Sequence, residues 1–147
     1  MKYLIFRIFL CLVLSQTIGY TQNKVASYYL ERITTCRFLK DGKPYEITAS
    51  FATYEKFYVF TSWQNVKGTH TAESYWYDPQ DKLRSVVPVS FESKNGIYNT
   101  WFWFKVGHSG NLAMALWTDE GWESIGKWHV DIYLDDKFIQ KLDFTVG

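Results

Sequence analysis

Cysteine is scarce in this chain of 147 residues, which contains only Cys11 and Cys36. Cys11 lies in an apolar N-terminal run that has the layout of a signal peptide, so one cysteine would remain in the mature protein. One cysteine cannot form an internal disulfide, and a secreted domain without disulfides depends on a packed core, which a chain of this length can supply. We therefore expect Cys36 to be a buried small apolar residue.

Neither sign of charge is in excess, because 16 Lys and Arg stand against 15 Asp and Glu. Removing a signal peptide would take away Lys2 and Arg7 and leave 14 basic residues beside all 15 acidic ones, a net charge of about −1. Nucleic-acid binding calls for a basic patch or stripe, and this balance provides none. The charge pattern therefore gives no reason to expect a nucleic-acid partner.

The N-terminus has the features of a secretory signal peptide. Basic residues precede an uncharged apolar run at 8–14, and small or polar residues follow around Gly19 and Thr21. The apolar run is shorter than the roughly 20 residues that span a bilayer, although an uncleaved anchor remains the alternative. Cys11 lies inside the run and lacks the small preceding residue of a lipoprotein site. We predict a signal peptide at 1–21 and a single domain at 22–147, in a secreted or periplasmic protein.

Short strand-like segments separated by turns fill the remaining chain, and no long helical pattern occurs. The stretch 127–134 alternates apolar and polar residues, Asp135 and Asp136 form a turn pair, and 137–146 returns, which predicts a β-hairpin. Pro88 within a strand-like segment predicts an edge or bulged strand, because proline cannot donate to a ladder. About seven or eight short strands spaced in this way favour an antiparallel β-sandwich.

Several motifs resemble a group of bacterial secreted immunoglobulin-like sandwich domains, over most of the chain after Ile33. The resemblance implies a sandwich fold and an interaction or accessory role, and it brings no active site. Asp136 stands where the group more often has glycine, which implies a less tight turn. The matching motifs are W-x-N-V-x-G-x-H at Trp63–His70, W-Y-D-P at Trp76–Pro79, G-K-W-x-V-x-I-Y-L-D-D at Gly126–Asp136 and F-T-V at Phe144–Val146.

The stretch NTWFWFKV, residues 99–106, contains four consecutive aromatic residues and does not alternate as a half-buried strand should. Phe102 and Phe104 share one predicted face and are the better core candidates. Trp101 and Trp103 share the other face. They are either packed in the core or covered by the segment 107–125, the interpretation that the sequence favours, or exposed as a binding platform. Tryptophan offers a rigid apolar plane with a polar N–H at its edge, on which sugar rings and partner side chains pack.

Two groups of residues could suggest catalysis or metal binding, and each has a simpler interpretation. The acidic loop at 119–123 contains Asp119, Glu120 and Glu123 and is bracketed by Trp117 and Trp122, an arrangement seen at sugar sites and in ordinary loops alike. His129 and Asp131 share one face at period two, and His70 could join them, but a solvated outer face is the simpler interpretation. His108 lies in a polar loop. We therefore expect neither a metal nor a catalytic site.

The sequence as a whole predicts an all-β, immunoglobulin-like antiparallel sandwich that acts outside the cytoplasm as a non-catalytic binding module. We expect a protein or polysaccharide partner, no cofactor, and no stable membrane span after signal cleavage. The alternatives are a carbohydrate-binding module in the strict sense and a small hydrolase that uses the acidic loop. The predicted binding residues are Trp101, Trp103, Trp117 and Trp122.

Overall fold

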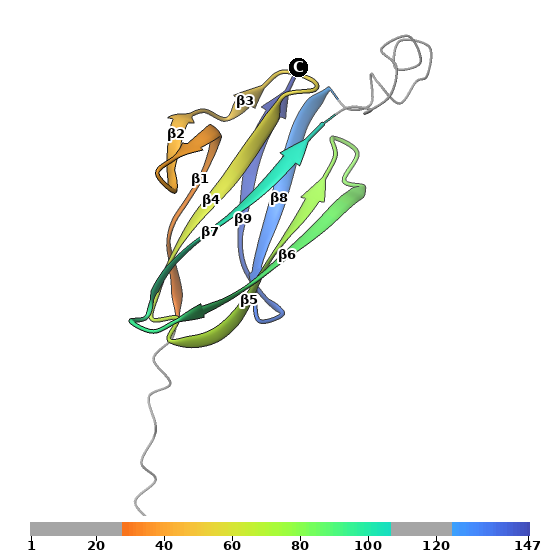
Figure 1. Ribbon diagram of the computed structural model, residues 1–147. Coiled ribbons are helices and arrows are strands. Elements are labelled where there is room, and N and C mark those ends of the chain that lie inside the picture. Colours follow the sequence, from red (N-terminus) through yellow and green to blue (C-terminus); the bar gives the residue numbers. More distant parts are fainter. Residues whose placement is uncertain (1–27, 107–124) are drawn as a thin grey trace, which may run out of the picture.

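The computed structural model describes residues 28–106 and 125–147, and these residues form nine strands (Figure 1). No helix in this part of the chain has the length and apolarity needed to cross a membrane. The strands are β1 (Tyr29–Lys40), β2 (Lys43–Ile47), β3 (Ser50–Phe51), β4 (Lys56–Gln64), β5 (Gly68–Tyr77), β6 (Leu83–Ser93), β7 (Ile97–Lys105), β8 (Gly126–Leu134) and β9 (Lys137–Val146).

The nine strands form two sheets, with orders β2-β1-β4-β7 and β3-β9-β8-β5-β6. The chain enters the second sheet for β3 and returns to the first for β4. It then changes sheet between β4 and β5, between β6 and β7, and between β7 and β8. Short β3 pairs in parallel with the last strand, whereas the other pairs are antiparallel. Two sheets with these crossings form an immunoglobulin-like sandwich, as the sequence predicts. The edge prediction for Pro88 is also confirmed, because β6 is the last strand of its sheet.

The core lies between the inner faces of the two sheets and is rich in aromatic rings. The predicted inward residues of β8 are confirmed, since Trp128, Val130, Ile132 and Leu134 are all buried. Trp76 is also fully buried and donates its indole N–H to Ser74 Oγ at 2.9 Å. Such a partner offsets the cost of burying the polar end of an indole, so these rings can fill the space between the sheets without an unpaired N–H.

The W-Y-D-P motif closes the turn between β5 and β6. Asp78, whose side chain is 1% exposed, accepts hydrogen bonds from the backbone N–H groups of Gln80 and Lys82, both at 2.9 Å. Its second oxygen accepts from Arg84 Nε at 2.5 Å. Burial alone would raise the pKa of Asp78, but these hydrogen bonds outweigh it and lower the pKa below the usual aspartate value. The motif therefore has a structural role, because Asp78 stabilises the turn.

The hairpin between β8 and β9 turns within two residues, Asp135 and Asp136, at φ values of 50° and 63°. Positive φ at both positions defines the tight turn that matches the twist of a hairpin. The expectation that Asp136 loosens the turn is therefore wrong, because aspartate tolerates this backbone conformation better than most residues do. Asp135 also accepts a hydrogen bond from the Thr71 N–H at 2.9 Å, which ties the turn to β5.

We expect Asp78→Asn to lower the free energy of unfolding by about 2 kcal/mol at pH 7, because the Arg84 guanidinium loses a buried charged partner. Because folding lowers the pKa of Asp78, its stabilising effect is complete at pH values above the unfolded-state pKa of about 3.9. The effect is lost as the pH falls through the lower pKa of the folded state. The difference in the free energy of unfolding between wild type and variant should therefore decrease below about pH 4. Urea unfolding from pH 7 to pH 2 measures this difference, and a difference that stays constant over the range would contradict this account.

Candidate binding face

β7 places Trp101 and Trp103 on the outer face of the first sheet. Trp101 is 46% exposed and Trp103 is 54% exposed, whereas Thr100 and Phe102, which alternate with them along the strand, are 2% and 1% exposed. Phe104 is partly buried against the core cluster. The prediction that Phe102 and Phe104 pack in the core is confirmed, and packing of Trp101 and Trp103 in the core is wrong. The segment predicted to cover the two tryptophans lies, up to residue 124, outside the described residues. A strand turns successive side chains to opposite faces, so burial of the phenylalanines directs both indoles outward.

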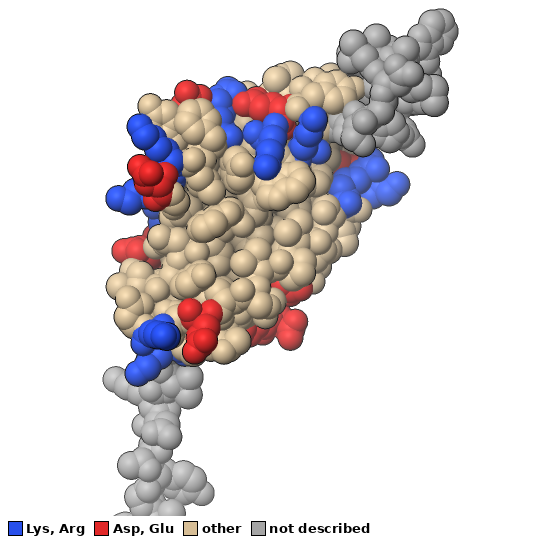
Figure 2. Space-filling view, in the orientation of Figure 1, with Lys and Arg blue, Asp and Glu red and all other residues tan. Residues whose placement is uncertain are grey.

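The neighbouring strand extends this outer surface. In the register of β4 with β7, Phe60 lies opposite Trp101 and Tyr58 lies opposite Trp103. We call these four rings the aromatic face, in which Tyr58 is partly exposed and Phe60 is buried. Figure 2 shows the side of the molecule that carries β4, β6 and β7, where charged side chains gather at the margins and leave the middle largely uncharged. The arrangement therefore offers apolar rings surrounded by polar groups, as a binding surface requires.

Two side chains on this outer side are buried although they do not belong to the core cluster. Phe60 is 4% exposed, and Cys36, which lies opposite Tyr58, is fully buried. Pairing of β1 with β4 stops at Cys36, and Figure 1 shows β1 bending away where it turns into β2. The burial of Cys36 is thus confirmed, and that burial raises the pKa of its thiol, as expected for an unreactive cysteine.

A groove of 570 Å³ opens beside the aromatic face, between the β1–β2 hairpin and the strands. Glu31 at its side accepts hydrogen bonds from Ser62 Oγ at 3.1 Å and Gln64 Nε2 at 2.8 Å. Two cationic side chains, Arg32 and Lys43, also border the groove, so its charge is positive on balance. Its lining residues are Glu31, Arg32, Lys43, Pro44, Phe60, Ser62 and Asn99.

Lys56 contacts the other end of the aromatic face. Its Nζ lies 4.5 Å from the ring centroid of Trp103 and 5.2 Å from that of Tyr58. A lysine over an indole is attracted by the ring quadrupole and restricts the orientation of the ring. The indole of Trp103 is therefore held by a neighbour on β4, and a ligand would meet a partly ordered ring.

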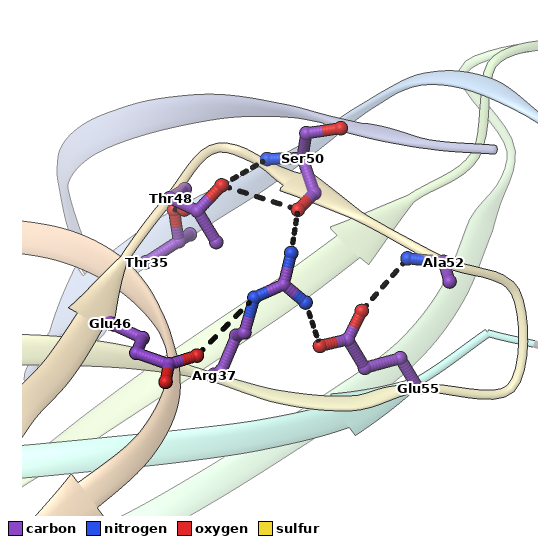
Figure 3. Close-up of polar contacts among 7 residues, drawn as sticks. All are labelled: Thr35, Arg37, Glu46, Thr48, Ser50, Ala52 and Glu55. Atoms are coloured by element: carbon purple, nitrogen blue, oxygen red, sulfur yellow. Dashed lines mark hydrogen bonds and ion pairs between the residues drawn. The ribbon is translucent and has the colours of Figure 1, made fainter.

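A dense polar cluster beside β3 has a structural explanation. Arg37 donates to the carboxylate of Glu55 and to the Ser50 carbonyl, and its Nε lies 3.7 Å from Glu46 (Figure 3). Glu55 in turn accepts from the Ala52 N–H at 2.8 Å. These contacts hold the segment in which the chain passes from the first sheet to the second. Because both oxygens of Glu55 already have partners, the cluster is a poor candidate for catalysis.

The structure does not bring the candidate metal ligands together. His129 and Asp131 share the outer face of the second sheet, as predicted, but His70 instead contacts Asp135, with 2.7 Å between Nδ1 and Oδ2. The described residues contain no group of three His, Cys, Asp or Glu side chains placed to hold a metal ion.

Several residues with sequence-based predictions lie outside the described residues. These are Trp117 and Trp122 of the predicted aromatic surface, Asp119, Glu120 and Glu123 of the acidic loop, His108, and the signal peptide with Cys11.

Sequence reasoning missed the residues that complete the surface. Tyr58 and Phe60 belong to an apolar run, and no local pattern shows that they lie opposite the two tryptophans. Arg32 and Lys43 come from separate strands and meet only because the hairpin bends. The one usable signal was the polar residue Asn99, which the sequence places on the tryptophan face and the structure places in the groove.

We expect Trp101→Ala and Trp103→Ala each to lower the free energy of unfolding by about 1 kcal/mol, because half of each ring is already in water. Phe102→Ala, one residue away on the buried face, should cost about 3–5 kcal/mol. Urea denaturation of the three variants measures the contrast. Equal losses at all three positions would mean that the tryptophans belong to the core.

No protein-family model matches the chain, and no curated protein matches it. Its solved structural neighbours include an immunoglobulin-like protein from Pseudomonas aeruginosa, at 13% identity and a TM-score of 0.47, over 84% of this chain and 99% of that one. They also include the CARDB domain of a Pyrococcus furiosus protein in complex with di-metal ions, at 8% identity and a TM-score of 0.46, over 82% and 92% of the two chains.

A third neighbour is an alkylpurine DNA glycosylase from Pseudomonas fluorescens bound to DNA with an abasic site analog. The identity is 5% and the TM-score is 0.51, over 81% of this chain but only 30% of the glycosylase. At such low identity the likeness concerns the fold alone. The assignment of an immunoglobulin-like sandwich rests on the chain's own strand topology.

Proposed function

We propose that this protein is an extracytoplasmic, non-catalytic binding module whose partner packs on Trp101 and Trp103. The observation that carries the proposal is the exposure of both indoles, 46% and 54%, side by side on one sheet face next to an open groove. The partner is a polysaccharide or another protein, since both present rings or apolar side chains that pack on indole planes.

The energetics of two half-exposed indoles are adequate for binding. Covering the exposed half of each ring removes about 100 Å² from water and contributes about 2.5 kcal/mol. Both rings lie on a strand held by nine residue pairs with β4, so little backbone ordering accompanies binding. Residues of this kind dominate the affinity of many interfaces, because rigid aromatic side chains lose little entropy when they are covered.

The groove beside Trp101 supplies polar groups that would orient a ligand. The Asn99 amide can both donate and accept, and Arg32 and Lys43 offer cationic donors. Alternating apolar and hydrogen-bonding groups suit a sugar chain, which has an apolar ring face and hydroxyl edges. This composition is the reason to keep a carbohydrate-binding module as the specific form of the proposal.

A non-catalytic role fits the chemistry of the groove. Glycoside hydrolysis uses two carboxylates across a cleft, one of them with a raised pKa. Among the residues that line this groove, Glu31 is the single carboxylate, and it already accepts from Ser62 and Gln64. The acidic loop with Asp119 and Glu123 remains the basis of the alternative, a small hydrolase.

We expect Trp101→Ala and Trp103→Ala each to weaken partner binding about tenfold or more, because each removes one packing plane. The measurement is co-sedimentation with a panel of insoluble glycans, followed by titration of the retained ones. Phe138→Ala is the matched control, since Phe138 is 51% exposed and lies on β9 of the other sheet. Glycan binding that survives both tryptophan substitutions would contradict the proposed site.

The alternatives separate in the same assay. Glycan binding with loss on substitution supports the carbohydrate-binding form, whereas absence of glycan binding together with association between proteins supports a protein partner. Release of soluble sugar that requires Asp119 and Glu123 would favour the hydrolase.

We also expect the exported protein to begin at Gln22 or Tyr20, because the signal peptide is predicted to end at Thr21 or Gly19. Expression of the full chain in a Gram-negative host, fractionation, and N-terminal sequencing of the extracytoplasmic fraction measure this. A full-length product that begins at Met1 and stays in the cytoplasm would contradict the proposed location.

A further inference from the structure

In the part of the chain that the structure describes, each sheet ends in two edge strands, and three of these four edges carry features that discourage pairing with another chain. β3 has two residues. β2 has five, with Pro44 inside it and Glu46 at a φ of 50°. β6 contains Pro88 near its middle and charged residues toward both ends. Short strands, prolines, irregular backbone and charges are the usual means by which edges avoid further pairing.

β7 is the exception among the described strands. It has nine residues, no proline or glycine, and one charged residue, Lys105, at its end. It pairs with β4 from Lys56 opposite Lys105 to Gln64 opposite Ile97, without a register shift. Its other side has no strand neighbour among the residues that the structure describes. A long, regular and apolar strand of this kind presents an open row of backbone N–H and C=O groups.

We propose that β7 pairs antiparallel with β7 of a second copy of this chain and joins two four-stranded sheets into one continuous sheet. Full overlap of the strand with itself places the two-fold axis at Trp101, the middle of Ile97–Lys105. Trp101 then lies opposite the same residue of the second copy. Asn99 lies opposite Trp103, and Ile97 lies opposite Lys105.

This register keeps the charged ends of the two strands apart and brings aromatic residues together. The two Lys105 side chains lie at opposite ends of the paired strands, about 27 Å apart, where their repulsion is screened. The tryptophans meet at the centre, and aromatic cross-strand pairs stabilise antiparallel sheets. A two-fold contact also closes on itself, so the open edge would not lead to fibres. The second copy is therefore the occupant that the sequence of β7 fits.

The proposed pairing goes beyond the binding function and does not depend on it. If both hold, the two aromatic faces become neighbours on one continuous sheet, and a long ligand could contact four exposed tryptophans instead of two. A bivalent surface of this kind binds a repeating partner more tightly than either half alone.

Sedimentation velocity over a range of protein concentrations should show a monomer–dimer equilibrium. Trp101→Lys and Trp101→Glu should each give monomers, because like charges meet at the two-fold axis, and an equimolar mixture of the two variants should recover the dimer. Phe138→Lys, at an equally exposed aromatic position on the other sheet, should leave the dimer intact. Since position 101 is half exposed, these variants are expected to fold, and circular dichroism checks this.

A cross-linking pair tests the register. Trp101→Cys should form a disulfide-linked dimer under mild oxidation, whereas Lys105→Cys should not, because its two copies lie at opposite ends. The native Cys36 is fully buried and does not interfere. A wild-type chain that remains monomeric at high concentration, or a dimer in which Lys105→Cys cross-links and Trp101→Cys does not, would overturn the proposal. Glycan binding by a monomer would leave the proposed function standing and refute only the pairing.

Discussion

The packing of aromatic rings between the two sheets is the constraint on which the other features depend. Phe104 of β7 stacks on Trp76 of β5, with ring centroids 4.8 Å apart, and Phe57 of β4 lies 5.0 Å from Phe144 of β9. These contacts join the sheets without a disulfide, since Cys36 is a free thiol. Large rings bury enough apolar area for a small sandwich to be stable by packing alone.

The same constraint explains the outer surface. Once the inner residues of β7 are fixed against the second sheet, the period of two directs Trp101 and Trp103 to the outside. The bend of β1 into β2 adds a second effect, because it buries Phe60 and Cys36 on the outer side and leaves a groove next to the tryptophans. The candidate site is therefore a consequence of how the core and the hairpin are arranged.

Much of the architecture could be predicted from local patterns. The alternation at 127–134 identified the inward residues of β8, and Pro88 identified an edge strand, because both signals depend on backbone chemistry within a few residues. The prediction of a less tight turn at Asp135 and Asp136 was wrong, because aspartate also adopts the positive φ for which such turns prefer glycine. The groove could not be predicted, because Arg32, Lys43 and Asn99 come from three strands that a nonlocal register brings together.

The sequence by itself determined that this chain is a β-sandwich with a surplus of aromatic residues, because turn chemistry and side-chain periodicity are local properties. It also narrowed the open question to two tryptophans on one strand. Only the tertiary structure decided that these rings lie outside the core, that Phe60 and Tyr58 lie beside them, and that β7 is an edge among the described strands. Burial and strand order depend on contacts between residues distant in the sequence, and periodicity alone carries no information about which neighbour covers a face.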